Sequence, residues 1–197
     1  MSKQQSKQKL VAAAADLLRR RGLQATSVRE LAKHAGAPLG SVYHYFPGGK
    51  AEFVADAVTF TGGQVEKQLA DCLALGPLDG FKRYFAQWRT VLLSSGYAAG
   101  CPLAAISMDA QAKQDAPEAL IRVSKVFHDL RTQIAVCLQA EGLAQPQAEQ
   151  LATTIIAITE GAILICRANQ DLDALEVAES SVLSLLSGSL ISSASEA

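Results

Sequence analysis

The stretch TSVRELAKHAGAPLGSVYHYF, residues 26–46, decides how the N-terminal part of the chain folds. Ser27 and Glu30 have the spacing of a capping box, which predicts the start of a short helix. Residues 35–38, Ala-Gly-Ala-Pro, predict a tight turn, and another short helix follows over about 39–45. The stretch therefore reads as two short helices joined by a glycine-containing turn, which is a helix-turn-helix pattern.

The segment before this stretch supplies a further helix. Residues 6–21 repeat apolar side chains with a helical period, and we expect the three arginines at their end, 19–21, to form a solvated helix terminus. The helix over 39–45 is too short to be stable alone. We therefore expect Val42 and Phe46 to dock on the two earlier helices, so that the opposite face of the short helix projects outward.

This outward face suits the major groove of DNA. An α-helix fits that groove, and small side chains let the backbone approach the base edges. Leu39 cannot hydrogen-bond a base, so we expect it to contact a thymine methyl group or a sugar. The face is predicted to carry Leu39, Gly40, Ser41, Tyr43 and His44, while Tyr45 is shared between surface and core.

Contacts to DNA phosphates are expected at two helix N-termini, where free N–H groups and the positive end of the helix dipole lie. Thr26 and Ser27 stand at one of them, and Lys50 stands at the other. A basic arm is also predicted ahead of the first helix, formed by Lys3, Lys7 and Lys9.

Charge is distributed unevenly along the 197 residues, although the net charge is only −1. Residues 1–50 hold nine basic and two acidic groups, a net +7, and the remainder is therefore −8. Hydrophobic residues make up 49% of the chain, which excludes a disordered protein. A basic head on an acidic, apolar body indicates a nucleic-acid partner for the head.

The rest of the chain also reads with a helical period, so the predicted fold class is all-α. Residues 1–50 are expected to form a three-helix DNA-binding domain, and residues 51–197 a helical body. Further helices are predicted over about 50–75, 79–95, 103–114, 117–141, 146–170 and 172–191, with a frayed tail from Ser192.

Several classes of protein are disfavoured. The first ten residues contain no apolar run of a secretory signal, and Ile155–Cys166 is shorter than a membrane span. Four widely spaced cysteines fit reduced thiols in a cytoplasmic protein better than a zinc site or disulfides. We see no catalytic constellation, so we expect no enzyme activity, no metal and no cofactor. The alternative is an enzyme or a helical small-molecule-binding protein without a DNA-binding role.

Some residues of the body could line a pocket for an apolar or aromatic small molecule. Phe81, Phe85 and Trp88 share one helix face, which more often marks a core than a pocket. Cys101 is either a structural thiol or a sensor, and Glu160 could bind a ligand, join Arg131 or Arg167, or lie at a dimer seam. The candidate ligand-binding set is Phe81, Tyr84, Trp88, Cys101, Met108, Phe127 and Glu160.

The order, spacing and residue types over about residues 6–55 resemble the DNA-binding region of TetR-family transcriptional regulators. The likeness rests on residues 26–32, Thr-Ser-Val-Arg-Glu-Leu-Ala, then Gly36, then residues 40–46, Gly-Ser-Val-Tyr-His-Tyr-Phe. It implies that residues 51–197 are a ligand-binding and dimerisation domain. It further implies a homodimer that binds an operator and releases it when a small molecule binds this domain. The implied phosphate and base contacts come from Thr26, Arg29, Tyr43, His44, Tyr45 and Lys50.

Two further features bear on the subgroup and the assembly. The linker Pro47–Lys50 is about one residue longer than is common, and with residues 100–103, Gly-Cys-Pro-Leu, it is similar to a subgroup that includes lincomycin-resistance and flavonoid-responsive repressors. The last two predicted helices carry broad apolar faces that two-fold pairing into a four-helix bundle would bury. The expected operator is then a palindrome.

Overall fold

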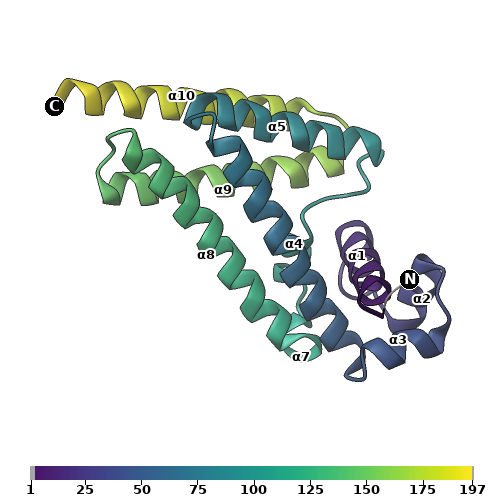
Figure 1. Cartoon of the computed structure of the whole chain (residues 1–197). Helices are drawn as coiled ribbons and strands as arrows, with labels where there is room; N and C mark the ends of the chain where they lie inside the picture. The colour runs from purple at the N-terminus through teal and green to yellow at the C-terminus, as the bar shows by residue number, and fades with distance from the viewer. Residues whose placement is uncertain (1–2, 197) are drawn as a thin grey trace. The chain divides into compact units, whose positions relative to one another are not determined.

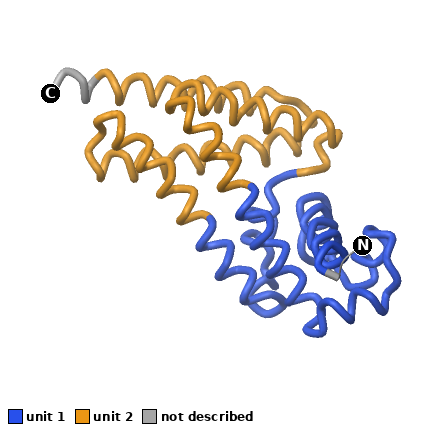
Figure 2. Tube along the Cα trace, in the orientation of Figure 1, with its two compact units in different colours: residues 1–64, 100–126 blue, residues 65–99, 127–197 orange. Residues whose placement is uncertain are grey.

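A computed structural model of the chain describes the backbone of residues 3–196 and the side chains of residues 4–191. The described residues form helices and no strand, which confirms the all-α prediction (Figure 1). They divide into two compact units: unit 1 comprises residues 1–64 and 100–126, and unit 2 comprises residues 65–99 and 127–197 (Figure 2). The predicted head, residues 1–50, thus belongs to a larger unit that also includes residues 100–126.

Unit 1 contains the predicted helix-turn-helix. Its helices are α1 (Lys3–Arg21), α2 (Val28–Ala35), α3 (Leu39–Tyr45), the first part of α4 (Gly49–Leu73), α6 (Pro102–Ser107), α7 (Ala112–Asp115) and the first part of α8 (Pro117–Ala140).

The start of α1 corrects the prediction of a basic arm. The helix already begins at Lys3, so Lys7 and Lys9 lie within it, while the side chain of Lys3 is outside the described residues. The Lys7 ammonium lies 2.8 Å from the Asp56 carboxylate and 5.3 Å from the centroid of the Phe46 ring. Lys7 therefore holds α1 against α4 and the end of α3.

Local sequence explains the geometry of α2 and α3. The Ser27 side chain accepts a hydrogen bond from the Glu30 N–H at 3.2 Å, which confirms the predicted cap of α2. Gly36 ends α2 in the left-handed conformation, with φ 60°, which glycine adopts without steric cost. Val42 and Phe46 are fully buried, as predicted, and so the other face of α3 is left at the surface.

The single helix predicted over 103–114 is wrong, because the structure has two short helices there, α6 and α7. Side-chain bonds stabilise the turn between them. Asp109 accepts the N–H of Gln111 at 2.8 Å, and the Gln24 amide donates to Asp109 at 3.0 Å and to Asp115 at 3.3 Å. The last two bonds span more than 80 residues of sequence, so local periodicity could not reveal them.

Unit 2 is built from the rest of α4 and α8 with α5 (Pro77–Ser94), α9 (Gln145–Asn169) and α10 (Asp173–Glu196). Helix α9 packs against α10 and α5. Phe81 and Phe85 of α5 are buried in this core. The backbone of α10 continues to Glu196, beyond the predicted helix end at residue 191.

Helices α9 and α10 are long and apolar enough, by length and composition alone, to cross a membrane. The sequence prediction considered only the most apolar stretch, Ile155–Cys166, which Thr159 and Glu160 interrupt, and so judged the segment too short. Eight residues of α9 are buried within the protein, among them Leu151, Ile155 and Ile163. The test of length and composition alone is weak evidence for a membrane span, because a core helix passes it as well.

Candidate functional site

The exposed face of α3 is the first part of the candidate site. Tyr43 is 54% exposed and Leu39 is 41% exposed, and His44 is also at the surface. Ser41 and Tyr45 are half-buried. A Cβ placed on Gly40 would meet no atom within 4 Å, so the backbone of α3 is open to close approach at this position. All five residues predicted to project outward are therefore at least partly exposed to solvent.

The two residues predicted at the start of α2 differ in accessibility. Ser27 is exposed, and its hydroxyl hydrogen can still donate to a phosphate while its oxygen caps Glu30. Thr26 is 0% exposed, and its Oγ1 donates to the Gly22 carbonyl oxygen at 2.7 Å. Its backbone N–H is also used, because it donates to the Leu23 carbonyl. Thr26 thus closes the turn between α1 and α2, and its side chain offers no surface to DNA.

Ion pairs within unit 1 neutralise the arginines at the end of α1. The Asp16 carboxylate lies 2.6 Å from Arg19, 3.0 Å from Arg20 and 2.9 Å from the His34 ring. Burial raises the pKa of Asp16, but the hydrogen bonds and charges of Arg19 and Arg20 outweigh it and hold this pKa below its ordinary value. Arg21 pairs with Glu30 at 2.8 Å. The expectation that these arginines are not DNA contacts is consistent with their internal pairing.

Only part of the predicted positive charge of the head is therefore available to a partner. Lys50, predicted as a phosphate contact, lies 3.4 Å from the Asp115 carboxylate. Arg29, Lys33 and Lys9 are exposed, and they take part in no ion pair among the described residues of the chain. The formal charge of +7 overstates the number of cations that are free to bind a partner, because composition does not show which side chains form ion pairs.

A hollow of about 220 Å³ lies between α1 and the helix-turn-helix turn, within unit 1. Lys9 and Ser6 line it from α1, and Ser41 and Tyr45 line it from α3. Leu10 and residues 35–38 complete the wall. Sequence reasoning missed Ser6 as a neighbour of the recognition helix, because the two segments are about 35 residues apart and only the fold brings them together.

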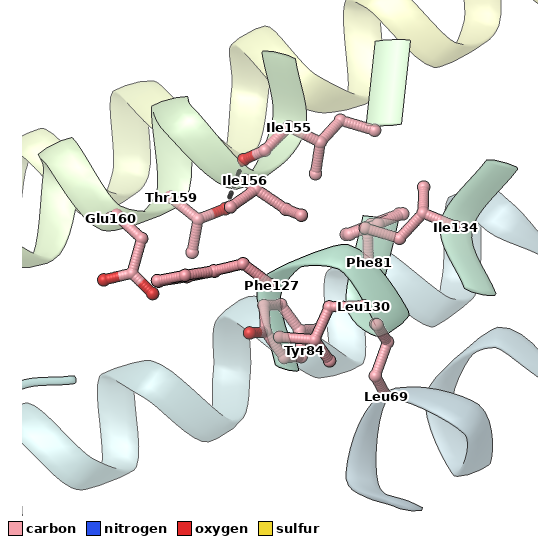
Figure 3. Close-up of a pocket in the computed structure, with 10 residues that line it drawn as sticks. All are labelled: Leu69, Phe81, Tyr84, Phe127, Leu130, Ile134, Ile155, Ile156, Thr159 and Glu160. Carbon is pink, nitrogen blue, oxygen red and sulfur yellow. Dashed lines mark hydrogen bonds between the residues drawn. The ribbon is translucent and has the colours of Figure 1, made fainter. Parts of the chain in front are cut away.

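Unit 2 contains a second candidate site, an apolar pocket shown in Figure 3. It brings together four of the predicted ligand-binding residues, Phe81, Tyr84, Phe127 and Glu160. The remaining lining residues were missed by the sequence analysis, although those on α8 and α9 have a helical spacing that is a usable signal. They are Leu69, Leu130, Ile134, Ile155, Ile156 and Thr159.

Three predicted ligand-binding residues do not line this pocket. Trp88 is half-buried on α5 and is not among the residues that line the pocket. Cys101 and Met108 belong to unit 1, where Cys101 is buried at the start of α6 and Met108 is 61% exposed. Their assignment rested on position in the sequence alone, and the pocket within unit 2 is complete without them.

Three of the four thiols are poor candidates for chemistry. Burial raises the pKa of Cys72, Cys137 and Cys166, so each is protonated at neutral pH and weakly nucleophilic. Among the described residues, no group of three or more His, Cys, Asp or Glu side chains could hold a metal ion. The two sites of interest are thus the α3 surface and the unit 2 pocket.

Comparisons with known proteins identify the families that the two parts of the chain resemble. Residues 10–57 match the bacterial regulatory proteins of the tetR family, and residues 77–181 match the C-terminal domain of LmrA/YxaF-like transcriptional regulators. The HTH-type transcriptional regulator Rv0196 of Mycobacterium tuberculosis is 35% identical over 184 residues, which cover 91% of this chain and 93% of that protein. The HTH-type transcriptional regulator LmrA of Bacillus subtilis is 25% identical over 172 residues, covering 84% and 88% of the two chains.

A solved structure shows the same fold. The regulatory protein TetR from Rhodobacter sphaeroides superposes with a TM-score of 0.79 at 23% identity, covering 90% of this chain and 97% of that one. The matched families are transcriptional regulators and not enzymes, which confirms the expectation drawn from the missing catalytic motifs. The chain therefore belongs to the TetR family of helix-turn-helix transcriptional regulators, with an LmrA/YxaF-like C-terminal domain.

Proposed function

We propose that this regulator is a cytoplasmic, dimeric repressor that binds a palindromic operator through α3 and releases it when a small molecule enters the unit 2 pocket. The observation that carries the proposal is the surface of α3. Its exposed side chains include a phenol, an imidazole and an aliphatic group, which suit base edges, sugars and thymine methyl groups. The exposed cations Arg29, Lys33 and Lys9, which form no ion pair among the residues that the structure describes, supply phosphate contacts.

The proposed contacts have separate roles. Tyr43, His44 and Leu39 face the groove, with Gly40 and Ser41 allowing close approach. Contacts to the sugar–phosphate backbone of DNA are assigned to Ser27, Arg29, Tyr45 and Lys50. Lys50 makes its contact after release from its pair with Asp115. Phosphate contacts provide most of the affinity, so binding falls steeply as salt concentration rises.

The proposed dimer uses exposed faces of α9 and α10. Leu164 and Ile165 on α9 are each 49% exposed, and Val177 on α10 is 66% exposed. Gly161 and Gly188 lie on the same two helices, and a Cβ at either would meet nothing within 4 Å. Pairing of the two helices with those of a second copy would bury this apolar surface in a four-helix bundle.

Sedimentation of the purified protein tests the dimer. We expect the variant Leu164→Glu with Val177→Glu to sediment as a monomer, because it places four carboxylates in the proposed seam of each dimer. Val136→Glu is the matched control, since Val136 is an exposed apolar residue on α8. A dimer that survives the double substitution and dissociates with the control would contradict this choice of face.

DNA binding is tested at Tyr43. Tyr43→Phe removes one hydroxyl and leaves the ring, so loss of a contact to the operator lowers affinity by about 0.5–1.5 kcal/mol. Tyr97→Phe makes the same chemical change within unit 2 and should have no effect. Fluorescence anisotropy with labelled DNA from upstream of the gene measures both, and equal affinities for all three proteins would remove Tyr43 from the interface.

The effector acts by two-state coupling in this proposal. It favours a dimer arrangement in which the two α3 helices no longer match successive major grooves, so both half-sites weaken together. Linkage requires that operator DNA weaken effector binding by the same factor. Effector affinity that is identical with and without operator DNA would refute induction.

A further inference from the structure

Lys50 lies close to the exposed face of α3 because the connection between α3 and α4 is short. Only residues 46–48 separate the two helices, and their turn is closed by a hydrogen bond from the Gly49 N–H to the Phe46 carbonyl oxygen at 2.9 Å. Lys50 is the second residue of α4, and its side chain is 25% exposed. The ammonium is therefore accessible to a phosphate that flanks the groove occupied by α3.

The Asp115 carboxylate is held beside this ammonium by packing and by a hydrogen bond. Asp115 ends α7, whose first residue Ala112 is buried, as is Ala116 directly after it. Gln24, in the turn between α1 and α2, donates its side-chain amide to Asp115 at 3.3 Å. The oxygen that accepts this bond lies 3.4 Å from the Lys50 ammonium, and Figure 1 shows α7 beside the first turns of α4.

The segment that carries Asp115 is attached to the helix-turn-helix region at further points. The Gly100 N–H donates to the Arg19 carbonyl oxygen at 3.0 Å, and the Gln24 amide donates to Asp109 at 3.0 Å. All of these residues belong to unit 1. The pair of Lys50 with Asp115 is thus a property of unit 1 itself.

A carboxylate and a DNA phosphate are rival partners for one ammonium. Both are negatively charged and accept hydrogen bonds, so a phosphate that binds Lys50 must displace the Asp115 carboxylate or lie close to it. Displacement breaks an existing ion pair, and proximity places two like charges together. Asp115 opposes phosphate binding in either arrangement.

We propose that Asp115 competes with DNA phosphate for Lys50 and thereby sets the strength of DNA binding. This inference rests on the proposed function, since it takes Lys50 as a phosphate contact. The side chains of the pair are 25% and 36% exposed, so solvent screens their attraction and the effect is moderate. Removing the charge of Asp115 should tighten DNA binding about two- to fivefold for each half-site.

Charge removal without loss of the hydrogen-bond acceptor tests the proposal. Asp115→Asn keeps an amide oxygen that can accept the bond from Gln24. Asp109→Asn is the matched control, because Asp109 is also half-buried and bonded to Gln24 but forms no ion pair among the residues that the structure describes. Fluorescence anisotropy of the full-length proteins on a short labelled duplex measures affinity. Phosphate contacts are independent of sequence, so DNA of unrelated sequence serves as well as DNA from upstream of the gene.

A double-mutant cycle with Lys50→Gln separates local competition from the general field of the carboxylate. Lys50→Gln alone should weaken binding and lower the slope of log affinity against log salt by about 0.9 for each half-site. Asp115→Asn should tighten binding more than Asp109→Asn does when Lys50 is present. In the Lys50→Gln background, the two substitutions should have equal effects.

Thermal unfolding checks that each variant is folded. If Asp115→Asn is not folded, Asp115→Ser takes its place, because serine also offers an oxygen acceptor without a charge.

The outcomes for this inference and for the proposed function are distinct. Weaker or unchanged binding by Asp115→Asn would overturn the competition, and weaker binding would instead make Asp115 a residue that orients Lys50 toward DNA. Equal tightening with and without Lys50 would also overturn it, because the effect would then come from the general field. If Lys50→Gln leaves affinity and salt slope unchanged, the phosphate contact assigned to Lys50 in the proposed function is wrong, and the inference fails with it.

Discussion

Replacing Thr26 with valine distinguishes a structural role from a DNA contact at the start of α2. Valine keeps the branched shape of threonine and removes the hydroxyl that donates to the Gly22 carbonyl oxygen at 2.7 Å. The side chain is fully buried, so the carbonyl loses its partner without gaining water. The expected loss in the free energy of unfolding is about 1–2 kcal/mol. For a chain of this size, that corresponds to a fall in melting temperature of about 2–8 °C.

The assay combines thermal unfolding with operator binding at equal protein concentration, because dimerisation makes melting temperature depend on concentration. At a temperature where both proteins are folded, Thr26→Val should bind the operator with unchanged affinity and an unchanged salt dependence. Thr26→Ser keeps the hydroxyl and is the control for its loss. An unchanged melting temperature together with weaker binding and a smaller salt slope would refute the structural role and restore Thr26 as a phosphate contact.

Three further predictions concern packing, pH and salt. Gly80→Ala should destabilise the protein by about 1–3 kcal/mol in chemical denaturation, because the added Cβ would lie 2.7 Å from the Cys72 carbonyl oxygen. Gly63→Ala is the control: the space around this position of α4 is open, so the substitution should stabilise the protein by up to about 1 kcal/mol. Asp16→Asn should lower the melting temperature at pH 7, and the difference from the unaltered protein should shrink as pH falls from about 4 through the lowered pKa of Asp16. The reason is that stabilisation by a pKa lowered on folding is complete above the unfolded value and is lost as pH falls through the folded value; a difference that does not shrink as the pH is lowered would contradict the charge pairing. Arg29→Ala should reduce the slope of log affinity against log salt by about 0.9 for each half-site, for operator and non-operator DNA alike, and an unchanged slope would exclude a phosphate contact.

The architecture of the head could be predicted from the sequence because its signals are local. The Ser27 cap, the left-handed Gly36 and the buried Val42 each act within a few residues, and all three are found in the structure. The division of residues 103–114 into the two helices α6 and α7 could not be predicted in this way. It depends on hydrogen bonds from Gln24 to Asp109 and to another carboxylate, which are distant in sequence.

The candidate sites show the same limit. The helical period predicts which side chains project from α3. The ion pairs of Lys50 with Asp115 and of Arg21 with Glu30 depend on the fold and could not be predicted in this way. A count of charges in the first fifty residues therefore indicates the kind of partner without identifying the cations that remain free. In unit 2, aromatic content indicated a pocket, but only packing separates Phe127, which lines it, from residues that do not.

A footprint of the purified protein on DNA from upstream of its gene tests the central claim most directly. The account predicts a protected palindrome whose half-sites are centred one helical turn apart, about 10–10.5 base pairs, or a multiple of that distance. Protection should weaken steeply as salt is raised from 50 to 200 mM. The absence of any protection by the folded protein at low salt, or a single asymmetric site, would contradict it.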